Sequence, residues 1–229
     1  MVDRHEGSFL ANGAGAIPAD ENAKLYDSIV RDILRHAPEP LAAASVLEVG
    51  CGTGEIMLRL EPHVKSVRGV DLSQRMIDVC RQRGLEADVV GETLPFADGS
   101  FDCLLLYSVL TNIEEAALVD RMLSEAFRVT KERGIVFLGN VPNANHLNFH
   151  VHSQRSAIEE LRHFVKRRLG RMGGSGQIQY YAYRPEQLVG YCARFGVDKF
   201  VMKQSLLSDI GMQKIDIIYR VGQTPRQGA

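Results

Sequence analysis

The chain has 229 residues, of which 45% are hydrophobic, and a formal net charge of −1 from 27 basic and 28 acidic residues. This length and apolar content suit a single domain with a sizeable core. The balanced charge does not favour nucleic acid or an anionic membrane as a partner, and no apolar run approaches the roughly 20 residues of a membrane-spanning helix.

Neither the N-terminus nor the cysteines suggest an exported protein. The segment 1–6 lacks the charged and then apolar pattern of a secretory signal. The four cysteines form no Cys-x-x-Cys pair, so we expect neither a metal site nor a disulfide framework; they are Cys51, Cys80, Cys103 and Cys192. We therefore expect free thiols in a cytoplasmic protein.

The first half of the chain predicts alternating helices and strands. Residues 1–21 are rich in glycine and small side chains and are interpreted as a flexible leader that precedes a domain over 22–229. Apolar spacing predicts helices over 22–35, 54–60, 73–83 and 115–130, and apolar runs predict strands over 45–49, 66–71, 86–90, 101–107 and 135–141. This alternation predicts a doubly wound α/β fold with a mainly parallel sheet.

The pattern changes after Pro142. Residues 143–183 contain polar loops, a basic stretch over 156–169 and a glycine cluster, and a segment of this length between core elements is usually functional. We interpret it as an insertion after the fifth strand that forms a lid on the acceptor side, over the substrate. A helix from Pro185 to near Gly196 and strands over 197–203 and 214–221 complete the domain.

The most informative motif is the glycine turn after the first strand. Gly50, Gly52 and Gly54 lack a Cβ, so the chain can turn tightly and a ligand can approach the main chain. The following helix presents unpaired N–H groups at its start. Asp71 lies 21 residues after Gly50, where nucleotide-binding sheets place a ribose-binding acid. The motif predicts an adenosine-containing cofactor.

The surroundings of the turn decide between cofactors. A dehydrogenase fingerprint requires a third glycine where this chain has Glu55, which disfavours a nicotinamide-dependent oxidoreductase. The run Gly-Cys-Gly-Thr-Gly instead resembles motif I of the class I S-adenosylmethionine-dependent methyltransferases. The resemblance continues, in family order, over 69–77, 94–102 and 127–134. It implies a Rossmann-like methyltransferase fold of seven strands, the last antiparallel, with S-adenosylmethionine as cofactor and S-adenosylhomocysteine as product.

The resemblance also implies roles for individual residues. Asp71 would accept hydrogen bonds from both ribose hydroxyls, or it could instead cap a helix. Glu48 would lie near the cofactor's ammonium group, or pair with N–H groups of the glycine turn, or do both. Tyr107 closes the fourth strand and is either a cofactor contact or a core aromatic. The residues assigned to the cofactor are Glu48, Gly50, Cys51, Gly52, Gly54, Asp71, Leu72, Met76, Gly91, Glu92 and Tyr107.

Two positions depart from the family pattern. Val90 stands where relatives often carry an acid for adenine, so Gly91 and Glu92 are expected to serve instead. Asn112 stands where relatives often carry His. Because an amide is not a base at neutral pH, Asn112 is assigned to substrate hydrogen bonding. Asp102, at the start of the fourth strand, is expected to organise the sheet edge.

Candidates for the acceptor side follow the fifth strand. His146 and His150 are nearest the carboxyl edge of the sheet, where ligands bind, and are the candidate general bases. The aromatic cluster Tyr180, Tyr181 and Tyr183 is expected to wall an acceptor pocket.

Together these features predict methyl transfer to a small molecule, at a hydroxyl oxygen of a sugar or secondary metabolite. N-methyl transfer and a cofactor-binding, non-catalytic partner subunit are the alternatives. A monomer or homodimer is expected.

Overall fold

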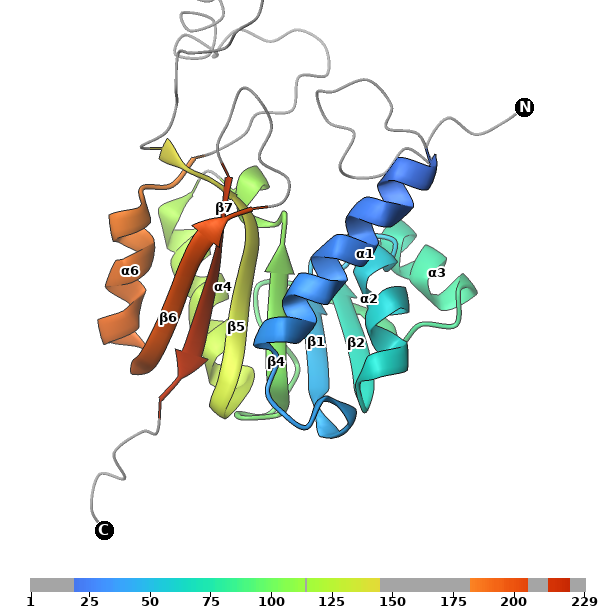
Figure 1. Ribbon diagram of the computed structural model, residues 1–229, viewed down its shortest axis with the longest axis horizontal. Coiled ribbons are helices and arrows are strands. Elements are labelled where there is room, and N and C mark those ends of the chain that lie inside the picture. Colours follow the sequence, from blue (N-terminus) through green and yellow to red (C-terminus); the bar gives the residue numbers. More distant parts are fainter. Residues whose placement is uncertain (1–18, 114, 145–181, 206–213, 223–229) are drawn as a thin grey trace, which may run out of the picture.

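The structure is a computed structural model that describes residues 19–113, 115–144, 182–205 and 214–222 (Figure 1). A single seven-stranded sheet with the order β3-β2-β1-β4-β5-β7-β6 forms its centre. The strands are β1 (Ser45–Val49), β2 (Ser66–Asp71), β3 (Ala87–Val89), β4 (Phe101–Tyr107), β5 (Thr130–Pro142), β6 (Val197–Gln204) and β7 (Lys214–Val221). The first five strands pair in parallel, and β7 runs antiparallel to both β5 and β6. The predicted doubly wound fold is confirmed.

Helices cover both faces of this sheet. The helices are α1 (Ala19–His36), α2 (Glu55–Leu60), α3 (Gln74–Gln82), α4 (Ala116–Val129) and α6 (Pro185–Arg194). Apolar side chains of α1, α2 and α3 pack on one face of the sheet, and those of α4 and α6 pack on the other (Figure 1). The central strand β4 is buried over almost its whole length, as expected for a strand covered by helices on both sides.

Several boundaries differ from the sequence prediction. Helix α1 begins at Ala19, so the last residues of the predicted leader are helical. Strand β5 begins at Thr130 rather than at Ile135, because Thr130 pairs with Phe101 before the register shifts and Ile135 pairs with Cys103. The predicted basic helix over 156–169 lies outside the described residues. In the described part of the chain, no helix has the length and apolar character needed to cross a membrane.

The predicted structural role of Asp102 is confirmed. Its Oδ2 accepts hydrogen bonds from the Ser45 backbone N–H at 2.9 Å and the Ser45 hydroxyl at 2.7 Å, and it pairs with the Lys131 ammonium at 2.9 Å. These contacts and that ion pair lower the pKa of Asp102 despite its partial burial. They tie the first residues of β1, β4 and β5 together at the amino edge of the sheet.

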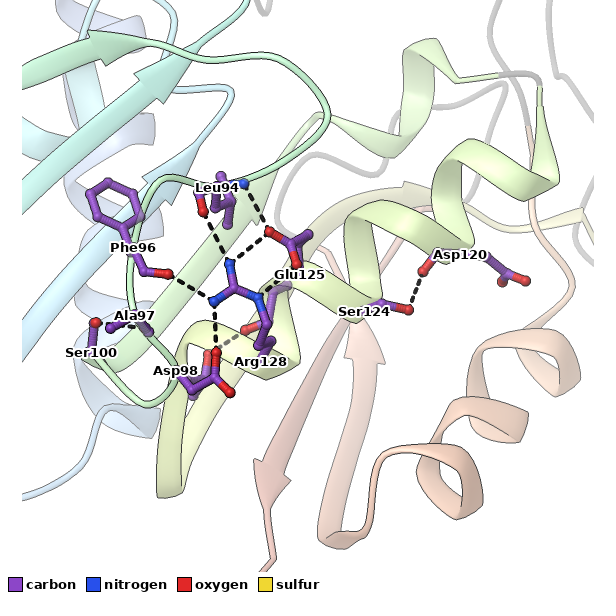
Figure 2. A network of polar contacts seen from close by, with 11 residues as sticks. Leu94, Phe96, Ala97, Asp98, Ser100, Asp120, Ser124, Glu125 and Arg128 are labelled. Carbon is purple, nitrogen blue, oxygen red and sulfur yellow. Dashed lines mark hydrogen bonds and ion pairs between the residues drawn. The ribbon is translucent and has the colours of Figure 1, made fainter.

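A network around Arg128 fixes the loop before β4 (Figure 2). The Arg128 guanidinium donates to the main-chain oxygens of Leu94 and Phe96 at 3.0 and 2.8 Å, and to the carboxylates of Asp98 and Glu125 at 2.7–2.8 Å. Glu125 also accepts from the Leu94 backbone N–H at 2.8 Å. Residues 94–98 are therefore held to α4 through two of its side chains, Arg128 and Glu125.

We expect Arg128→Ala to lower the free energy of unfolding by about 1–3 kcal/mol, because two main-chain carbonyls and the Glu125 carboxylate lose their donor. Chemical denaturation of the purified protein measures this change. Lys24→Ala, which removes an exposed 3.5 Å ion pair on α1, serves as the control and should change stability by less than about 0.5 kcal/mol. An equal effect of the two substitutions would contradict the assigned role.

Candidate cofactor site

A pocket opens at the carboxyl ends of β1 and β4, beneath helix α1. Its lining comes from four places: α1, the end of β1 with the glycine turn, the start of α2, and the end of β4. The lining residues are Tyr26, Glu48, Gly50, Cys51, Gly52, Thr53, Glu55, Ile56, Tyr107 and Ser108. Five of them were assigned to the cofactor from the sequence: Glu48, Gly50, Cys51, Gly52 and Tyr107.

The three glycines of the turn differ in what surrounds the position of a Cβ atom. Gly50, Gly52 and Gly54 all have positive φ, at 73°, 53° and 82°, where other residues are strained. A Cβ on Gly50 would lie 2.6 Å from Val109, and one on Gly54 would lie 2.3 Å from Leu85, so both positions are also closed by packing. Nothing lies within 4 Å of a Cβ on Gly52. The open side of Gly52 is therefore where a ligand can approach the backbone.

Asp71 holds the turn from the end of β2. Its Oδ2 accepts from the Gly52 backbone N–H at 3.0 Å, and its Oδ1 accepts from the Ser73 backbone N–H at 2.9 Å. Ser73, not Asp71, caps α3 by accepting from the Met76 backbone N–H at 3.4 Å. A carboxylate offers about four acceptor positions, so these two bonds leave capacity for a diol. Asp71 is half-buried beside the open face of Gly52.

Glu48 is a buried acid with one carboxyl oxygen that has no hydrogen-bond partner. It is 3% exposed, faces the pocket from β1, and its Oε2 has no hydrogen-bond partner. Burial raises the pKa of Glu48 well above its usual value, and the charges of Cys80 and Asp71 raise it further, while a backbone N–H at Met57 opposes the rise. An unpaired buried carboxyl is destabilising, so this side chain is suited to receive a cationic group.

Helix α1 covers the pocket through Tyr26. This side chain is 6% exposed, and burial, aided by the nearby Glu55 and Glu48, raises its pKa to about 12. The Arg59 guanidinium lies 5.2 Å from the centre of the Tyr26 ring. Arg59 and Arg83 also bind the Glu55 carboxylate at 2.8 and 2.6 Å. Although partial burial of Glu55 raises its pKa, the two arginines outweigh that effect and lower it overall.

The far end of the pocket is formed by Tyr107 and Ser108. The Tyr107 ring lies over Gly139, where a Cβ would be 2.1 Å away, and its hydroxyl is hydrogen-bonded to Ser205. Tyr107 is thus both a core aromatic and a pocket wall. Ser108 has φ 60°, and its hydroxyl accepts from the Asn140 amide at 2.6 Å.

A buried polar network stands behind this end of the pocket. The Asn140 backbone N–H donates to Asp216 on β7 at 2.8 Å, and Lys203 on β6 donates to both Asp216 and Asp32 of α1. Burial raises the pKa of Asp216, although its hydrogen bonds and Lys203 oppose this. The network joins α1 to the last two strands and fixes Asn140, which supports Ser108.

The other six residues assigned to the cofactor are not part of the pocket lining; they are Gly54, Asp71, Leu72, Met76, Gly91 and Glu92. Leu72 is 77% exposed and follows Asp71, while Met76 is half-buried on α3. Gly91 follows β3 with nothing within 4 Å of a Cβ, and the exposed Glu92 pairs with Arg121 at 2.8 Å. The adenine assignment to Gly91 and Glu92 stays a prediction.

Most acceptor-side candidates cannot be placed. His146, His150, Tyr180 and Tyr181 lie outside the described residues. Tyr183 pairs with Asn143 at the end of β5, and its hydroxyl donates to the main-chain oxygens of Ile113 and Leu110 at 2.6 and 3.2 Å. The backbone of Asn112 belongs to the short helix η3 (Leu110–Asn112). The Tyr183 hydroxyl therefore lies beside the backbone of the segment that contains Asn112, and the acceptor roles of both residues stay predictions.

Sequence reasoning missed Tyr26, Thr53, Glu55, Ile56 and Ser108 as pocket residues. Thr53, Glu55 and Ile56 adjoin the glycine motif, so their neighbourhood was a usable signal. Tyr26 belongs to the apolar face of a predicted helix and Ser108 follows an apolar strand; nothing local to either distinguishes it from a core or loop residue. Their place in the pocket results from how α1 crosses the ends of β1 and β4.

Comparison with known proteins agrees with this geometry. Residues 47–138 match the family described as a methyltransferase domain. A chondramide synthase from Chondromyces crocatus is 30% identical over 66% of this chain, which spans 4% of that protein. An uncharacterised protein from Methanocaldococcus jannaschii is 35% identical over 52% of this chain, which spans 54% of that protein. The matches thus cover only part of these relatives.

Solved structures share the fold. A crystal structure of an S-adenosylmethionine-dependent methyltransferase from Methanosarcina mazei aligns with a TM-score of 0.63 at 20% identity, covering 84% of this chain and 98% of that one. A geranyl diphosphate methyltransferase in complex with S-adenosylmethionine aligns with a TM-score of 0.59 at 12% identity, covering 85% of each chain. Over residues 47–138 this chain therefore resembles methyltransferase domains, and it shares its fold with solved methyltransferase structures.

The raised pKa of Glu48 predicts how stability depends on pH. The folded state holds the Glu48 proton more tightly than the unfolded state, so the stabilisation is present below the usual value of 4.5 and is lost as pH rises through the raised pKa. We expect Glu48→Gln to flatten the decline in unfolding free energy of the ligand-free protein above pH 4.5. Chemical denaturation across this range measures it. The exposed control Glu61→Gln should keep the wild-type dependence, and an unchanged slope in Glu48→Gln would contradict the assignment.

Proposed function

We propose that this protein transfers a methyl group from S-adenosylmethionine to a small-molecule acceptor. The methyltransferase domain match and the class I fold support an enzyme of this kind. The single observation that carries the proposal is the buried Glu48 Oε2, which faces the pocket without a partner. A dehydrogenase crevice offers no reason for an uncompensated acid at this point, whereas the ammonium of a methionine moiety supplies its missing partner.

The chain's own groups fit the parts of this cofactor. Glu48 fits the ammonium, the open side of Gly52 admits close approach to the backbone, and the spare acceptor positions of Asp71 suit two ribose hydroxyls. The aromatic rings of Tyr26 and Tyr107 close two sides of the pocket. We assign Glu48, Gly52 and Asp71 to the three polar parts of the ligand on this basis.

When bound, the cofactor would supply a methyl group already activated by the positive charge of its sulfonium. The protein therefore needs no covalent nucleophile of its own. Its task is to hold donor and acceptor within about 3–3.5 Å and to exclude water. Tyr26 on α1 and Tyr107 on β4 are the described side chains suited to exclude water, because both are nearly buried at the pocket.

For the acceptor we propose a hydroxyl oxygen of a small molecule such as a sugar or secondary metabolite. A hydroxyl must lose its proton as the methyl arrives, which suits a histidine base, and His146 and His150 follow β5 in the sequence. Related proteins are named as a malonyl-[acyl-carrier protein] O-methyltransferase and a demethylmenaquinone methyltransferase, so the relatives' acceptors are diverse.

Our first functional prediction concerns Glu48. We expect Glu48→Gln to weaken S-adenosylhomocysteine binding by about 1.5–3 kcal/mol, because the ligand's ammonium loses a charged partner. The loss should be absent for 5′-methylthioadenosine, which has the same nucleoside but no amino acid group. Isothermal titration calorimetry measures both. Equal losses for the two ligands would mean that Glu48 acts only on the fold.

The second functional prediction concerns Asp71. We expect Asp71→Ala to weaken both S-adenosylhomocysteine and 5′-methylthioadenosine by about 1.5–3 kcal/mol, since both carry the ribose. Asp71→Asn, which keeps the shape, controls for loss of the bond to Gly52. Asp78→Ala removes an exposed acid from neighbouring α3 and should leave both affinities unchanged. Unaltered affinity in Asp71→Ala would refute the ribose assignment, and binding of NAD by the wild type would favour an oxidoreductase.

Turnover separates the remaining alternatives. Labelled S-adenosylmethionine is incubated with a panel of hydroxyl and amine acceptors, and the methylated atom is identified by mass spectrometry. Transfer to oxygen that is lost in both His146→Ala and His150→Ala supports the proposal. Transfer to an amine would favour N-methylation, and cofactor binding with no transfer to any acceptor would favour a non-catalytic partner subunit.

A further inference from the structure

Two thiols meet beneath the glycine turn. Cys51 lies in the turn and lines the pocket, and Cys80 lies on α3 with no solvent exposure. The Cys80 Sγ is 3.2 Å from the Gly52 main-chain oxygen, and the Cys51 Sγ is 3.9 Å from the same oxygen. Both sulfurs thus lie around one carbonyl oxygen, and each thiol shifts the pKa of the other. They are 29 residues apart in sequence and belong to different elements.

Glycines make the space that these sulfurs occupy. A Cβ on Gly69 would lie 2.7 Å from the Cys51 Sγ, and a Cβ on Gly54 would lie 3.2 Å from the Cys80 Sγ. Gly69 is in the middle of β2 and Gly54 is the residue before α2. The two cysteines therefore lie between β2, the turn and α3, with a glycine beside each sulfur.

Access to the pair is through the pocket. Cys51 is 6% exposed and contributes to the pocket lining, whereas Cys80 lies behind it. A small reagent that enters the pocket meets Cys51 first. A molecule bound against Gly52 would cover this route, because Cys51 and Gly52 are adjacent in the lining.

The electrostatics give the two thiols unequal reactivity. The hydrogen bond from Cys51 lowers the pKa of Cys80, and the Arg83 charge adds to this effect against the opposing effect of burial. The same hydrogen bond, together with burial, raises the pKa of Cys51. Because a thiolate is the reactive form, the buried Cys80 is suited to attack the Cys51 sulfur once Cys51 has met an oxidant in the pocket.

We propose that Cys51 and Cys80 form a modification site at which a small hydroperoxide converts two thiols into a disulfide. The Cys51 sulfur, which lines the pocket, attacks a peroxide oxygen, the O–O bond breaks, and a sulfenic acid forms while the leaving oxygen takes the thiol proton. The Cys80 sulfur then attacks the Cys51 sulfur, the S–O bond breaks, and water leaves with the second proton. The thiols lose two electrons and the peroxide gains two.

The modification would act on cofactor binding, a consequence that rests on the proposed function. An S–S bond of about 2.05 Å requires the sulfurs to approach well inside hydrogen-bonding distance. Drawing the Cys51 sulfur onto Cys80 pulls on the turn, whose Gly52 N–H is bonded to Asp71 at 3.0 Å. A disulfide therefore disturbs this bond between the turn and β2, and lowers affinity for the nucleoside.

The test uses the full-length wild-type protein. Reduced, ligand-free protein is treated with hydrogen peroxide, remaining thiols are alkylated, and tryptic peptides are analysed by mass spectrometry. Residues 36–59 and 76–81 form separate tryptic peptides that each contain one cysteine, Cys51 or Cys80. We expect these two peptides to become linked, and saturating S-adenosylhomocysteine to slow the linkage about tenfold by covering the pocket.

Binding gives the second readout. Oxidised wild type should bind S-adenosylhomocysteine about tenfold more weakly, with recovery after dithiothreitol. Cys80→Ala should give no linked peptide and keep its affinity after peroxide, while Cys192→Ala, which alters a partly exposed cysteine on α6, should behave like wild type.

The outcomes are distinct. Absence of the linked peptide from ligand-free wild type would overturn the proposal, and so would linkage with full retention of affinity. If reduced protein fails to bind S-adenosylhomocysteine, the proposed function fails, but the linked peptide still decides whether the dithiol exists.

Discussion

The site depends on one constraint, the fixing of the turn after β1 to the end of β2. The Gly50 and Cys51 N–H groups both donate to the Val70 main-chain oxygen at 2.7 and 3.1 Å, and the Gly52 N–H donates to the Asp71 carboxylate at 3.0 Å. Three consecutive donors are thus committed to the neighbouring strand. The conformation this requires has positive φ at Gly50 and Gly52, which explains why glycine alternates along the turn. The open side of Gly52 and the placement of Cys51 follow from it.

Three acidic side chains on the sheet differ in how fully other groups of the protein pair with them. Asp102 accepts hydrogen bonds from Ser45 and Lys131, and Asp216 accepts them from the Asn140 N–H and from Lys203. Both are satisfied within the protein. Glu48 is equally removed from water, yet its Oε2 has no partner. Since buried polar groups are normally paired, this difference between Glu48 and the other two acids is the reason that we assign Glu48 to a ligand.

The sequence predicted the parts of the fold that are local. Strands β1 and β4 are mostly apolar, and β2 has buried valines on either side of Gly69, so their existence and order were accessible from the sequence. The antiparallel direction of β7 came only from the family resemblance, because a strand's direction leaves no mark on its own apolar pattern. The extension of β5 to Thr130 depends on its pairing with Phe101, which is a long-range contact. Likewise Tyr26 and Ser108 join the pocket through the packing of α1 and the end of β4, which no local pattern records.

The ion cluster behind the pocket links distant parts of the chain. Lys203 on β6 bonds to Asp32 on α1, the helix that also carries Tyr26 over the pocket. Tyr107 is likewise held by Ser205, which follows β6. During synthesis on the ribosome, every residue of the pocket lining emerges before Lys203 and Ser205 do. Because these late residues hold α1 and Tyr107 in place, the shape of the pocket depends on the C-terminal part of the chain as well as on the half that lines it.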